Sequence, residues 1–443
     1  MTAHEQWRSR TGFILATIGS AVGLGNIWRF SYVAGENGGA VFLLVYLVFV
    51  ALIGLPLVIA ELSLGRRAQG DAVTAFTAPG GGPWPLAGWL AVGGATLLLS
   101  YYAVIAGWAL SYAAGAVSGS LWSVAGAGYG GYFARFITGS TEPVLWQAAM
   151  LGLAVAVVIG GVQKGIERLN LWLMPVLALI IAALAVNALM LPGSTAGLHF
   201  LLSPDWQAFG RPDIYAAALG QAFFSIGVGA AVFATFGGYL PRSIPLPASA
   251  VTVVAGDTLF AVVAGLAIFP AVFAFGLDPK AGPELAFITL PQIFLAMPGG
   301  RLVGALFFML LAAAALTSMI SLLEVPVSVA MQRLRLHRRP ATLAVGLAVF
   351  VLGLPAALGY GLLAEVRIGG HGILDAVDAL VSNLILPLGG LAIALFVGWR
   401  IERGLALREA DLAGSAIGTA WLWLLRIPVP LAIAVVMIRS ALS

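Results

Sequence analysis

The chain is predicted to be an all-α integral membrane protein with eleven transmembrane helices, two of them interrupted near their middles. Hydrophobic residues make up 61% of its 443 residues and charged residues 9%, against about 25% charged in soluble proteins. Apolar stretches of about 20 residues, the length that crosses a bilayer, recur along the whole chain. Glycine-rich runs break two of these stretches about half a chain apart, at Ser20–Asn26 and Ser225–Ala231.

The apolar stretches place the spans in chain order. The first five are expected over residues 11–36, 40–65, 87–117, 144–161 and 168–191. Six more are expected over residues 213–239, 246–276, 301–332, 341–360, 372–399 and 415–438. The apolar run after the polar residues 1–10 is too long for a signal peptide, so the first span is expected to stay in the protein. The stretch Leu285–Leu295 is too short to cross and is expected to be a re-entrant or surface helix.

Basic residues follow alternate spans. Of the 22 Lys and Arg residues, 14 fall on one side of this topology, which the positive-inside rule makes cytoplasmic together with the N-terminus. The C-terminus should then face outward across a bacterial cytoplasmic (inner) membrane. Their dispersal in short loops argues against nucleic-acid binding. These residues are Arg8, Arg10, Arg66, Arg67, Lys164, Arg168, Arg242, Arg333, Arg335, Arg338, Arg339, Arg400, Arg403 and Arg408.

The composition also narrows the function classes. The absence of cysteine excludes disulfides, thiolate metal sites and cysteine catalysis. The four histidines fall at the N-terminus or in loops, and the membrane carboxylates fit no metal-ligand spacing, so an enzyme is not expected. Unwound backbone at membrane depth persists only where it lines a cavity or holds a ligand. Two interruptions in corresponding halves therefore indicate a transporter, with a channel or a sensor that binds without transport as the alternative.

Specific motifs carry a family resemblance. Gly19–Phe30, followed by Glu36–Gly39, closely resembles the first span of the neurotransmitter:sodium symporter family. Further matches occur in the family order at Pro56–Arg66, Gln221–Ser225, Gly256–Thr258, Phe287–Pro291 and Leu316–Ser318. The resemblance covers nearly the whole chain, and eleven spans rather than twelve match the shorter bacterial members.

This resemblance implies the LeuT-type fold, in which two five-helix repeats of opposite orientation enclose the substrate and two sodium ions. The expected parts are a cytoplasmic segment at 1–10, the first repeat at 11–191, the inverted repeat at 213–399 and an eleventh helix at 415–438. Sodium site 1 would use Ala21, Asn26, Ser225 and Asp257. Sodium site 2 would use Gly19, Val22, Ala314, Thr317 and Ser318. The amino acid would contact Ala21, Gly23, Gly25, Leu98, Tyr102, Phe224, Ser225, Gly227, Ala230, Ser318 and Leu322.

Three of these positions indicate the substrate class. Gly23 stands where monoamine-carrying relatives have an aspartate, which leaves room for a substrate carboxylate. Amide groups at broken-helix N-termini favour such an anion, and Tyr102 resembles the hydroxyl that binds it in the family. Gly227 and Ala230 replace a serine and a phenylalanine of the leucine-selective homologue. The enlarged pocket predicts a bulky L-amino acid, with tryptophan, tyrosine, phenylalanine, leucine and isoleucine as candidates; an osmolyte or a monoamine is disfavoured.

Asp257 departs from the chloride-dependent relatives. It replaces an asparagine of their sodium site, and Ala261 replaces a serine that helps to hold chloride, whereas Tyr46, Gln221 and Ser225 are kept. A carboxylate inside a span costs roughly 2.5 to 3.5 kcal/mol and requires a counter-ion. The hypothesis is that this carboxylate takes the place of chloride, and that it binds a proton on the empty return step.

The gates are expected at both ends of the site. Arg29 and Asp378 match the outer gate of the family, with Phe224 as the lid beneath it. At the inner gate His4 replaces the usual arginine and Gln332 the usual carboxylate, so that ion pair is expected to be missing. Closure of the inner gate is then expected to depend on Trp7, Tyr239, Glu324 or other contacts.

Two further features remain open at this stage. Gly165 and Pro175 frame nine residues at the start of the fifth span, a pattern that resembles one in bacterial members where unwinding admits water to sodium site 2. Glycine and proline each weaken a helix. Glu61 is a further carboxylate within a span, and a functional role and a structural hydrogen-bonding role are equally expected for it. The oligomeric state and the sodium stoichiometry cannot be predicted from the sequence.

Overall fold

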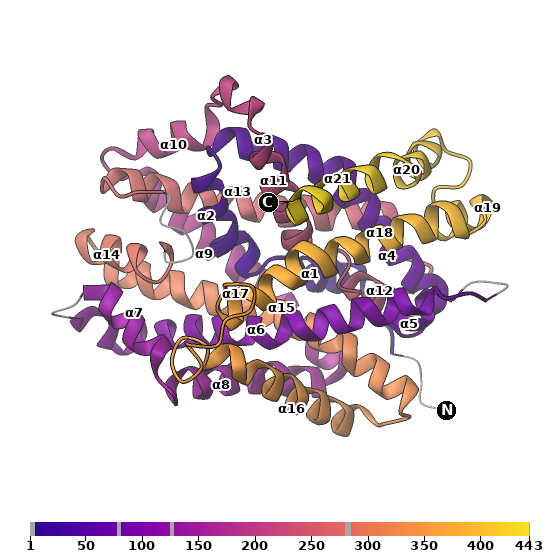
Figure 1. Ribbon diagram of the computed structural model, residues 1–443, viewed down its shortest axis with the longest axis horizontal. Coiled ribbons are helices and arrows are strands. Elements are labelled where there is room, and N and C mark those ends of the chain that lie inside the picture. The colour runs from indigo at the N-terminus through magenta and orange to yellow at the C-terminus, as the bar shows by residue number, and fades with distance from the viewer. Residues whose placement is uncertain (1–4, 78–80, 125–127, 280–284, 443) are drawn as a thin grey trace.

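The computed structural model describes residues 5–77, 81–124, 128–279 and 285–442. Helices form nearly all of the regular structure in these residues, beside one isolated β-bridge between Ile368 and His371. Most of the long helices run along the length of the molecule (Figure 1), with α5 and α19 at one end and α7, α10 and α14 at the other. The architecture is therefore a lengthwise helix bundle, as the apolar stretches predict.

Nine helices in the described residues are long and apolar enough to cross a membrane. They are α3–α4 (Ala40–Ala68), α6 (Pro85–Ser118), α8 (Glu142–Ile159), η4–α9 (Val162–Leu189), α13 (Leu246–Ala274), α15 (Gly300–Arg333), α16 (Arg338–Ala357), α17–η8 (Ile373–Arg400) and α20–α21 (Ala416–Ile438). The pair α1 (Arg10–Ala21) and η1–α2 (Gly25–Glu36), bent by 50°, is a tenth candidate. The pair α11 (Pro212–Ile226) and α12 (Val232–Gly238) occupies the place of the sixth predicted span.

Short helices join the long ones. They are α5 (Ala72–Ala75), η3 (Ser120–Ser123), α7 (Gly128–Thr138), α10 (Ser194–Leu202), η5 (Trp206–Gly210), α14 (Thr289–Ala296) and α19 (Arg403–Glu409). The apolar stretch that was predicted to be too short to cross contributes α14, a helix of eight residues. The fifth span begins earlier than predicted, because a π-helical turn, η4 (Val162–Glu167), precedes α9 (Arg168–Leu189).

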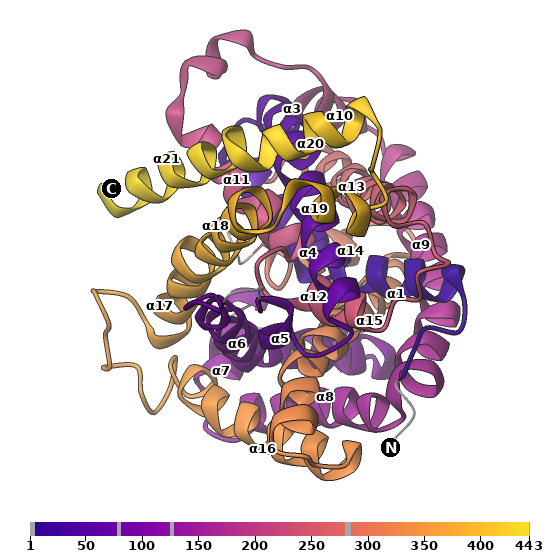
Figure 2. The ribbon, with the colours of Figure 1, turned by 90° about the vertical axis from the view of Figure 1, so that its right-hand side faces the viewer.

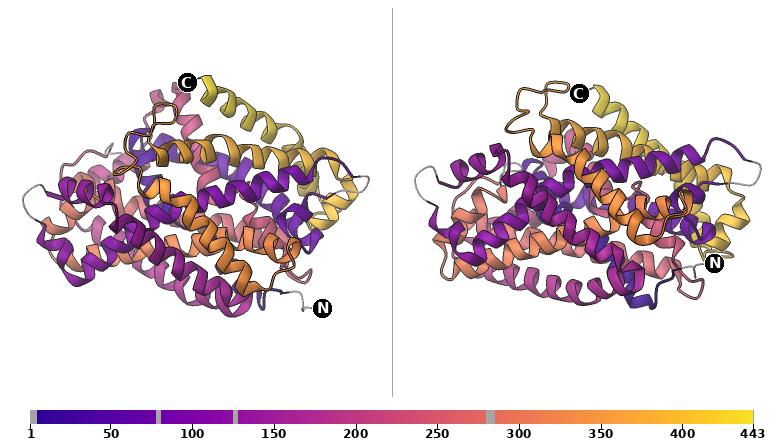
Figure 3. Two further views of the ribbon diagram at one scale, coloured as in Figure 1. Left: turned by 60° about the horizontal axis from the view of Figure 1, so that its bottom comes forward. Right: turned by 90° about the horizontal axis from the view of Figure 1, so that it is seen from below.

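The two longest helices, α6 and α15, have 34 residues each and pack against each other. Seen from the end that carries α5 and α19, α15 lies near the centre, whereas α9, α16 and α21 lie at the edge (Figure 2). Two further views in Figure 3, the right-hand one from below, show the same lengthwise packing. The central position of α15 brings it beside both interrupted helices, since it contacts α1 and α12 as well as α6.

The break between α11 and α12 has a clear local cause. Gly227, Gly229 and Ala231 all have positive φ angles, of 76°, 89° and 58°, which end a right-handed helix. A Cβ atom at Gly229 would lie 2.4 Å from the Leu386 carbonyl oxygen, so only glycine fits there. The interruption therefore depends on backbone conformations that favour glycine.

Glu61 satisfies the amide groups that this break exposes. Its fully buried carboxylate on α4 accepts hydrogen bonds from the Gly229 N–H at 3.1 Å and the Ala234 N–H at 3.3 Å. The first amides of a helix lack partners within the helix, and a buried unpaired amide is costly. The contacts of Glu61 thus support its structural hydrogen-bonding role.

Candidate substrate and ion site

The break in the first span lies between α6 and α15. After α1 ends at Ala21, Val22 is extended, with φ −70° and ψ 106°. In a continuous helix the next amides would bond carbonyls of α1, but the Gly23 N–H donates to Asn26 Oδ1 at 3.1 Å and the Leu24 N–H donates to the Tyr102 hydroxyl at 2.9 Å. The last carbonyls of α1 thereby lose their usual donors and become available as ligands.

Gly23 packs directly against two hydroxyl groups. A Cβ atom there would lie 2.3 Å from Ser318 Oγ and 2.6 Å from the Tyr102 hydroxyl oxygen. Tyr102 is buried at 4% exposure, so it is not an anchor at the membrane surface. The hydroxyls and the amides of the break form a small polar region around Gly23.

The apolar part of the site lies beside the second break. A Cβ atom at Gly227 would meet no heavy atom within 4 Å, so this position faces open space. Leu98 on α6, Ala230 at the break and Leu322 on α15 are buried. Gly25 packs against Phe224, whose ring would lie 3.1 Å from a Cβ there. The structure brings both breaks together through this contact.

Three residues predicted for sodium site 1 form one buried cluster. Asp257 on α13 accepts hydrogen bonds through Oδ1 from Asn26 Nδ2 at 2.7 Å and through Oδ2 from Ser225 Oγ at 2.9 Å. Asn26 Nδ2 also lies 3.1 Å from Ser225 Oγ. The Asn26 amide turns its nitrogen to the carboxylate and its oxygen to the Gly23 N–H, so the three side chains carry carboxylate, hydroxyl and amide oxygens. The donor set fits a hard cation, and Ala21, the fourth predicted member, lies buried at the end of α1.

The residues predicted for sodium site 2 also converge. Thr317 Oγ1 lies 2.8 Å from the Ala314 carbonyl oxygen and 3.4 Å from that of Val22. Ser318 Oγ lies 3.4 Å from each of these carbonyl oxygens. Four oxygens from α1 and α15 therefore meet at one place, which suits sodium. Gly19, the fifth predicted member, lies one turn earlier on α1, against Asn170 of α9.

Two of the positions predicted to match the chloride site of relatives, Tyr46 and Ser225, lie at the Asp257 carboxylate or one contact away from it. The Tyr46 hydroxyl lies 3.3 Å from Ser225 Oγ, and Gln221 Nε2 donates to the Gly25 carbonyl at 2.8 Å. Ala261 is fully buried. Ser225 therefore connects Tyr46 to the Asp257 carboxylate.

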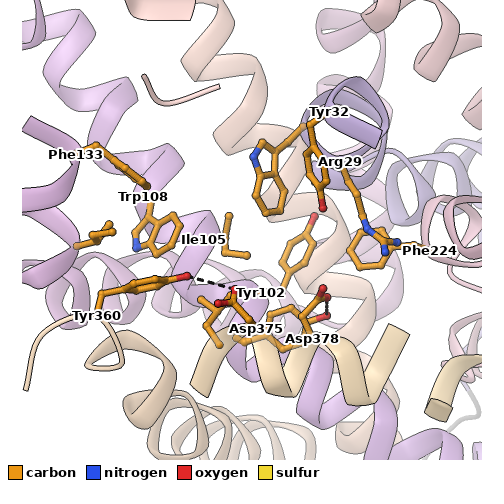
Figure 4. A pocket seen from close by; sticks show the side chains of 14 residues that line it. Arg29, Tyr32, Tyr102, Ile105, Trp108, Phe133, Phe224, Tyr360, Asp375 and Asp378 are labelled. Atoms are coloured by element: carbon orange, nitrogen blue, oxygen red, sulfur yellow. Dashed lines mark hydrogen bonds between the residues drawn. The ribbon is translucent and has the colours of Figure 1, made fainter. Parts of the chain in front are cut away.

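The outer-gate residues line one aromatic cavity of about 240 Å³ (Figure 4). Within the described residues no ion pair joins Arg29 to Asp378. The Asp378 carboxylate accepts hydrogen bonds from the Tyr101 hydroxyl at 2.7 Å and Ser382 Oγ at 3.0 Å. The Arg29 guanidinium lies 4.3 Å from the ring centroid of Phe224, a cation–π distance. The direct or water-bridged pair remains a prediction.

The inner gate contains ion pairs that the sequence did not predict. Arg338 on α16 binds the Glu324 carboxylate at 2.7 Å and also binds Glu5 of the N-terminal segment. The Tyr239 hydroxyl donates to Glu324 at 2.7 Å, and Trp7 Nε1 donates to the Phe236 carbonyl at 2.9 Å. A charged network thus links the N-terminal segment to α12, α15 and α16.

The two residues that differ from the usual inner gate do not form this network. His4 lies outside the described residues, and Gln332 Oε1 accepts the Asp71 N–H at 2.8 Å. In the sequence Arg338 is one of several basic loop residues, and nothing distinguishes it from its neighbours. The one feature of the sequence that could have indicated these ion pairs is Glu324, because a carboxylate within a span requires a counter-ion.

The segment from Gly165 to Pro175 begins with a π-helical turn and continues as an α-helix. Gly165 lies in the π-helical turn η4, and a Cβ atom there would lie 2.1 Å from the Val157 carbonyl oxygen, so close packing against α8 requires glycine. Pro175 lies inside α9, which continues past it. Unwinding between these residues remains a proposal.

Comparisons with known proteins identify the class. A bundle with two interrupted helices and oxygen clusters at the breaks is the architecture of a sodium-dependent membrane transporter. Residues 4–129 and 138–443 match the sodium:neurotransmitter symporter family. The chain belongs to this family and is not an enzyme.

Individual relatives agree with this assignment. An uncharacterized sodium-dependent transporter of Bacillus subtilis, YhdH, is 41% identical over 98% of this chain and 97% of its own length. An uncharacterized sodium-dependent transporter of Haemophilus influenzae is 31% identical over 98% of each chain. The crystal structure of MhsT in complex with L-phenylalanine is similar with a TM-score of 0.93 and 50% identity, over 98% of this chain and 99% of that one. The LeuT-type fold is thereby confirmed.

Proposed function

We propose that the protein imports bulky hydrophobic L-amino acids together with sodium, without a requirement for chloride. The observations that carry the proposal are the open space at Gly227 in the second break and the polar region that Tyr102, Ser318 and the amides make at the first break. The two breaks are in contact at Gly25 and Phe224. Hydroxyl and amide groups suit a carboxylate, and the open space suits a large side chain. The similarity to MhsT, whose structure contains L-phenylalanine, supports the same substrate class.

The mechanism would be alternating access in the bacterial cytoplasmic membrane, with the N-terminus inside. Two sodium ions and the amino acid enter from the side of the aromatic cavity, and Arg29 and Asp378 close over them. Release to the cytoplasm requires the Arg338 network, the ion pairs of Arg338 with Glu324 and Glu5, to open. These ion pairs hold the N-terminal segment that precedes α1. Asp257 supplies the negative charge that chloride supplies in relatives. The sodium gradient provides the driving force.

Equilibrium binding tests this proposal. Labelled phenylalanine, tryptophan and leucine are incubated with purified protein in sodium or potassium, and each of the other amino acids is added as a competitor. Saturable binding in sodium but not in potassium is expected, with the bulky amino acids as the strongest competitors. Stronger competition by glycine or alanine, or no binding in sodium, would contradict the proposal.

Uptake into proteoliposomes separates a transporter from a sensor. An imposed sodium gradient should drive accumulation of the labelled amino acid, and collapse of the gradient should release it. Binding without accumulation would favour a sensor that retained the site but does not transport.

A further inference from the structure

Asn170 has a buried oxygen that no group described in the structure satisfies. The side chain is fully buried on α9, and its Nδ2 donates to the Ile166 carbonyl at 2.9 Å. Its Oδ1 accepts no hydrogen bond within the described part of the chain. A buried acceptor without a partner destabilises a fold, and an ion or a water commonly satisfies such an atom. This oxygen is therefore a candidate ligand atom.

The oxygen faces the end of the first half-helix. A Cβ atom at Gly19 would lie 2.1 Å from Asn170 Oδ1, so the amide packs directly on the α1 backbone. In a continuous helix the Gly23 N–H would bond the Gly19 carbonyl, but here it donates to Asn26. The break thus withdraws the usual donor from the carbonyl of Gly19, the residue against which the Asn170 amide oxygen packs.

The contact between Gly19 and Asn170 lies close to the oxygens assigned to sodium site 2. Val22, whose carbonyl contacts Thr317 and Ser318, is three residues after Gly19, directly past the end of α1. Towards the opposite end of α1, Glu167 accepts hydrogen bonds from the Arg8 N–H at 2.8 Å and Ser9 Oγ at 2.9 Å. Glu167 precedes Asn170 by three residues, so the two side chains lie on one side of the helical segment. Oxygens therefore follow the α1–α9 interface from site 2 towards the N-terminal segment.

We propose that Asn170 Oδ1 is a transient sodium ligand on the release path from site 2 to the cytoplasm. The inference rests on the proposed function, because it assumes that site 2 binds sodium. Backbone carbonyl oxygens at broken helices coordinate sodium in transporters of this kind, and a side-chain amide supplies a carbonyl oxygen of the same kind. Asn170 also stands midway between Gly165 and Pro175, so local opening of this segment would move the oxygen and let water reach the ion.

The test measures sodium release directly. Purified protein is loaded with radioactive sodium and diluted into potassium, and the retained ion is followed over time. Asn170→Leu removes the oxygen and keeps a similar shape. Release is expected to slow severalfold, while the sodium concentration that half-saturates the protein stays the same. Asn170→Asp keeps an oxygen and adds charge, and it is expected to lower that half-saturating concentration.

Asn187→Leu is the matched control, because it makes the same change on α9 at the other end of the helix. It should release sodium at the wild-type rate. Wild-type release from Asn170→Leu, or equally slow release from both leucine variants, would overturn the inference. A role limited to helix packing would lower the thermal midpoint of unfolding without changing release. If Asn170→Leu does not fold, Asn170→Ser is measured in the same way.

Failure of the proposed function gives a different result. In that case the wild-type protein itself would retain no sodium above the level of a potassium-washed blank. Sodium retention by the wild type together with unchanged release in the Asn170 variants would reject this inference alone.

Discussion

At the scale of single residues, Gly23 offers the sharpest test of the polar region. The Cβ atom of Gly23→Ala would lie 2.3 Å from Ser318 Oγ and 2.6 Å from the Tyr102 hydroxyl, so both must move. Sodium-dependent binding of phenylalanine is expected to weaken at least tenfold, or about 1.4 kcal/mol. Gly93→Ala on α6 is the control, since a Cβ there meets nothing within 4 Å. Equal affinities for the two variants would contradict the placement of the substrate carboxylate.

Asp257 is the residue that should decide the role of chloride. Wild-type binding is expected to be the same in sodium chloride and in sodium gluconate. Asp257→Asn removes the only carboxylate of its hydrogen-bonded cluster with Asn26 and Ser225, so binding should fall in gluconate and recover as chloride is added. Asp213→Asn, which changes an exposed carboxylate in an ion pair with Arg211, serves as the control. Chloride dependence of the wild type would refute the hypothesis.

At the scale of elements, the Arg338 network joins the N-terminal segment to α12, α15 and α16. Arg338→Gln would leave the fully buried Glu324 without its counter-ion, and breaking a buried pair in this way costs about 3–5 kcal/mol. The variant is expected to melt at a lower temperature and to open its inner side more often. Adding Glu324→Gln removes the unpaired charge and should restore most of the stability.

A cysteine reporter can follow that opening, because the chain contains no cysteine. Phe236 is fully buried and packs 5.0 Å from the Trp7 ring, so Phe236→Cys should react with a maleimide only when the N-terminal segment moves away. Faster alkylation is expected in the Arg338→Gln background and not in the Arg339→Gln background, where an exposed arginine is changed. The same rate in both would exclude the network as an inner gate.

The elements also show where prediction from the sequence ends. The breaks at Gly23 and Gly227 were predictable from the glycine-rich runs in two apolar stretches. Non-helical backbone at membrane depth persists only where it lines a cavity or holds a ligand. The π-helical turn at Gly165 was not predictable from the sequence, because Gly165 packs against the Val157 carbonyl of a neighbouring helix. The role of Arg338 was unpredictable on similar grounds. Its partner Glu5 is 333 positions away along the chain, and only the fold brings the two together.

At the scale of the whole molecule, hydropathy was sufficient for the architecture, because a bilayer requires about 20 apolar residues per span. All eleven predicted spans appear as helices or as interrupted pairs in the described residues. The sites themselves required the family resemblance. Oxygens of Val22, Thr317 and Ser318 converge only once α1 and α15 are packed, and no spacing in the sequence expresses that contact. The division into domains was not tested and stays a prediction.

Orientation in the membrane is the property of the whole molecule that remains to be measured. The exposed residues Ser203, after α10, and Arg335, between α15 and α16, lie on opposite sides of the predicted topology. On intact cells an impermeant maleimide should label Ser203→Cys but not Arg335→Cys, and lysis should expose the second. The reverse pattern would contradict the positive-inside assignment. It would also place the aromatic cavity of Arg29 and Asp378 on the cytoplasmic side, where an inward sodium gradient could not load it.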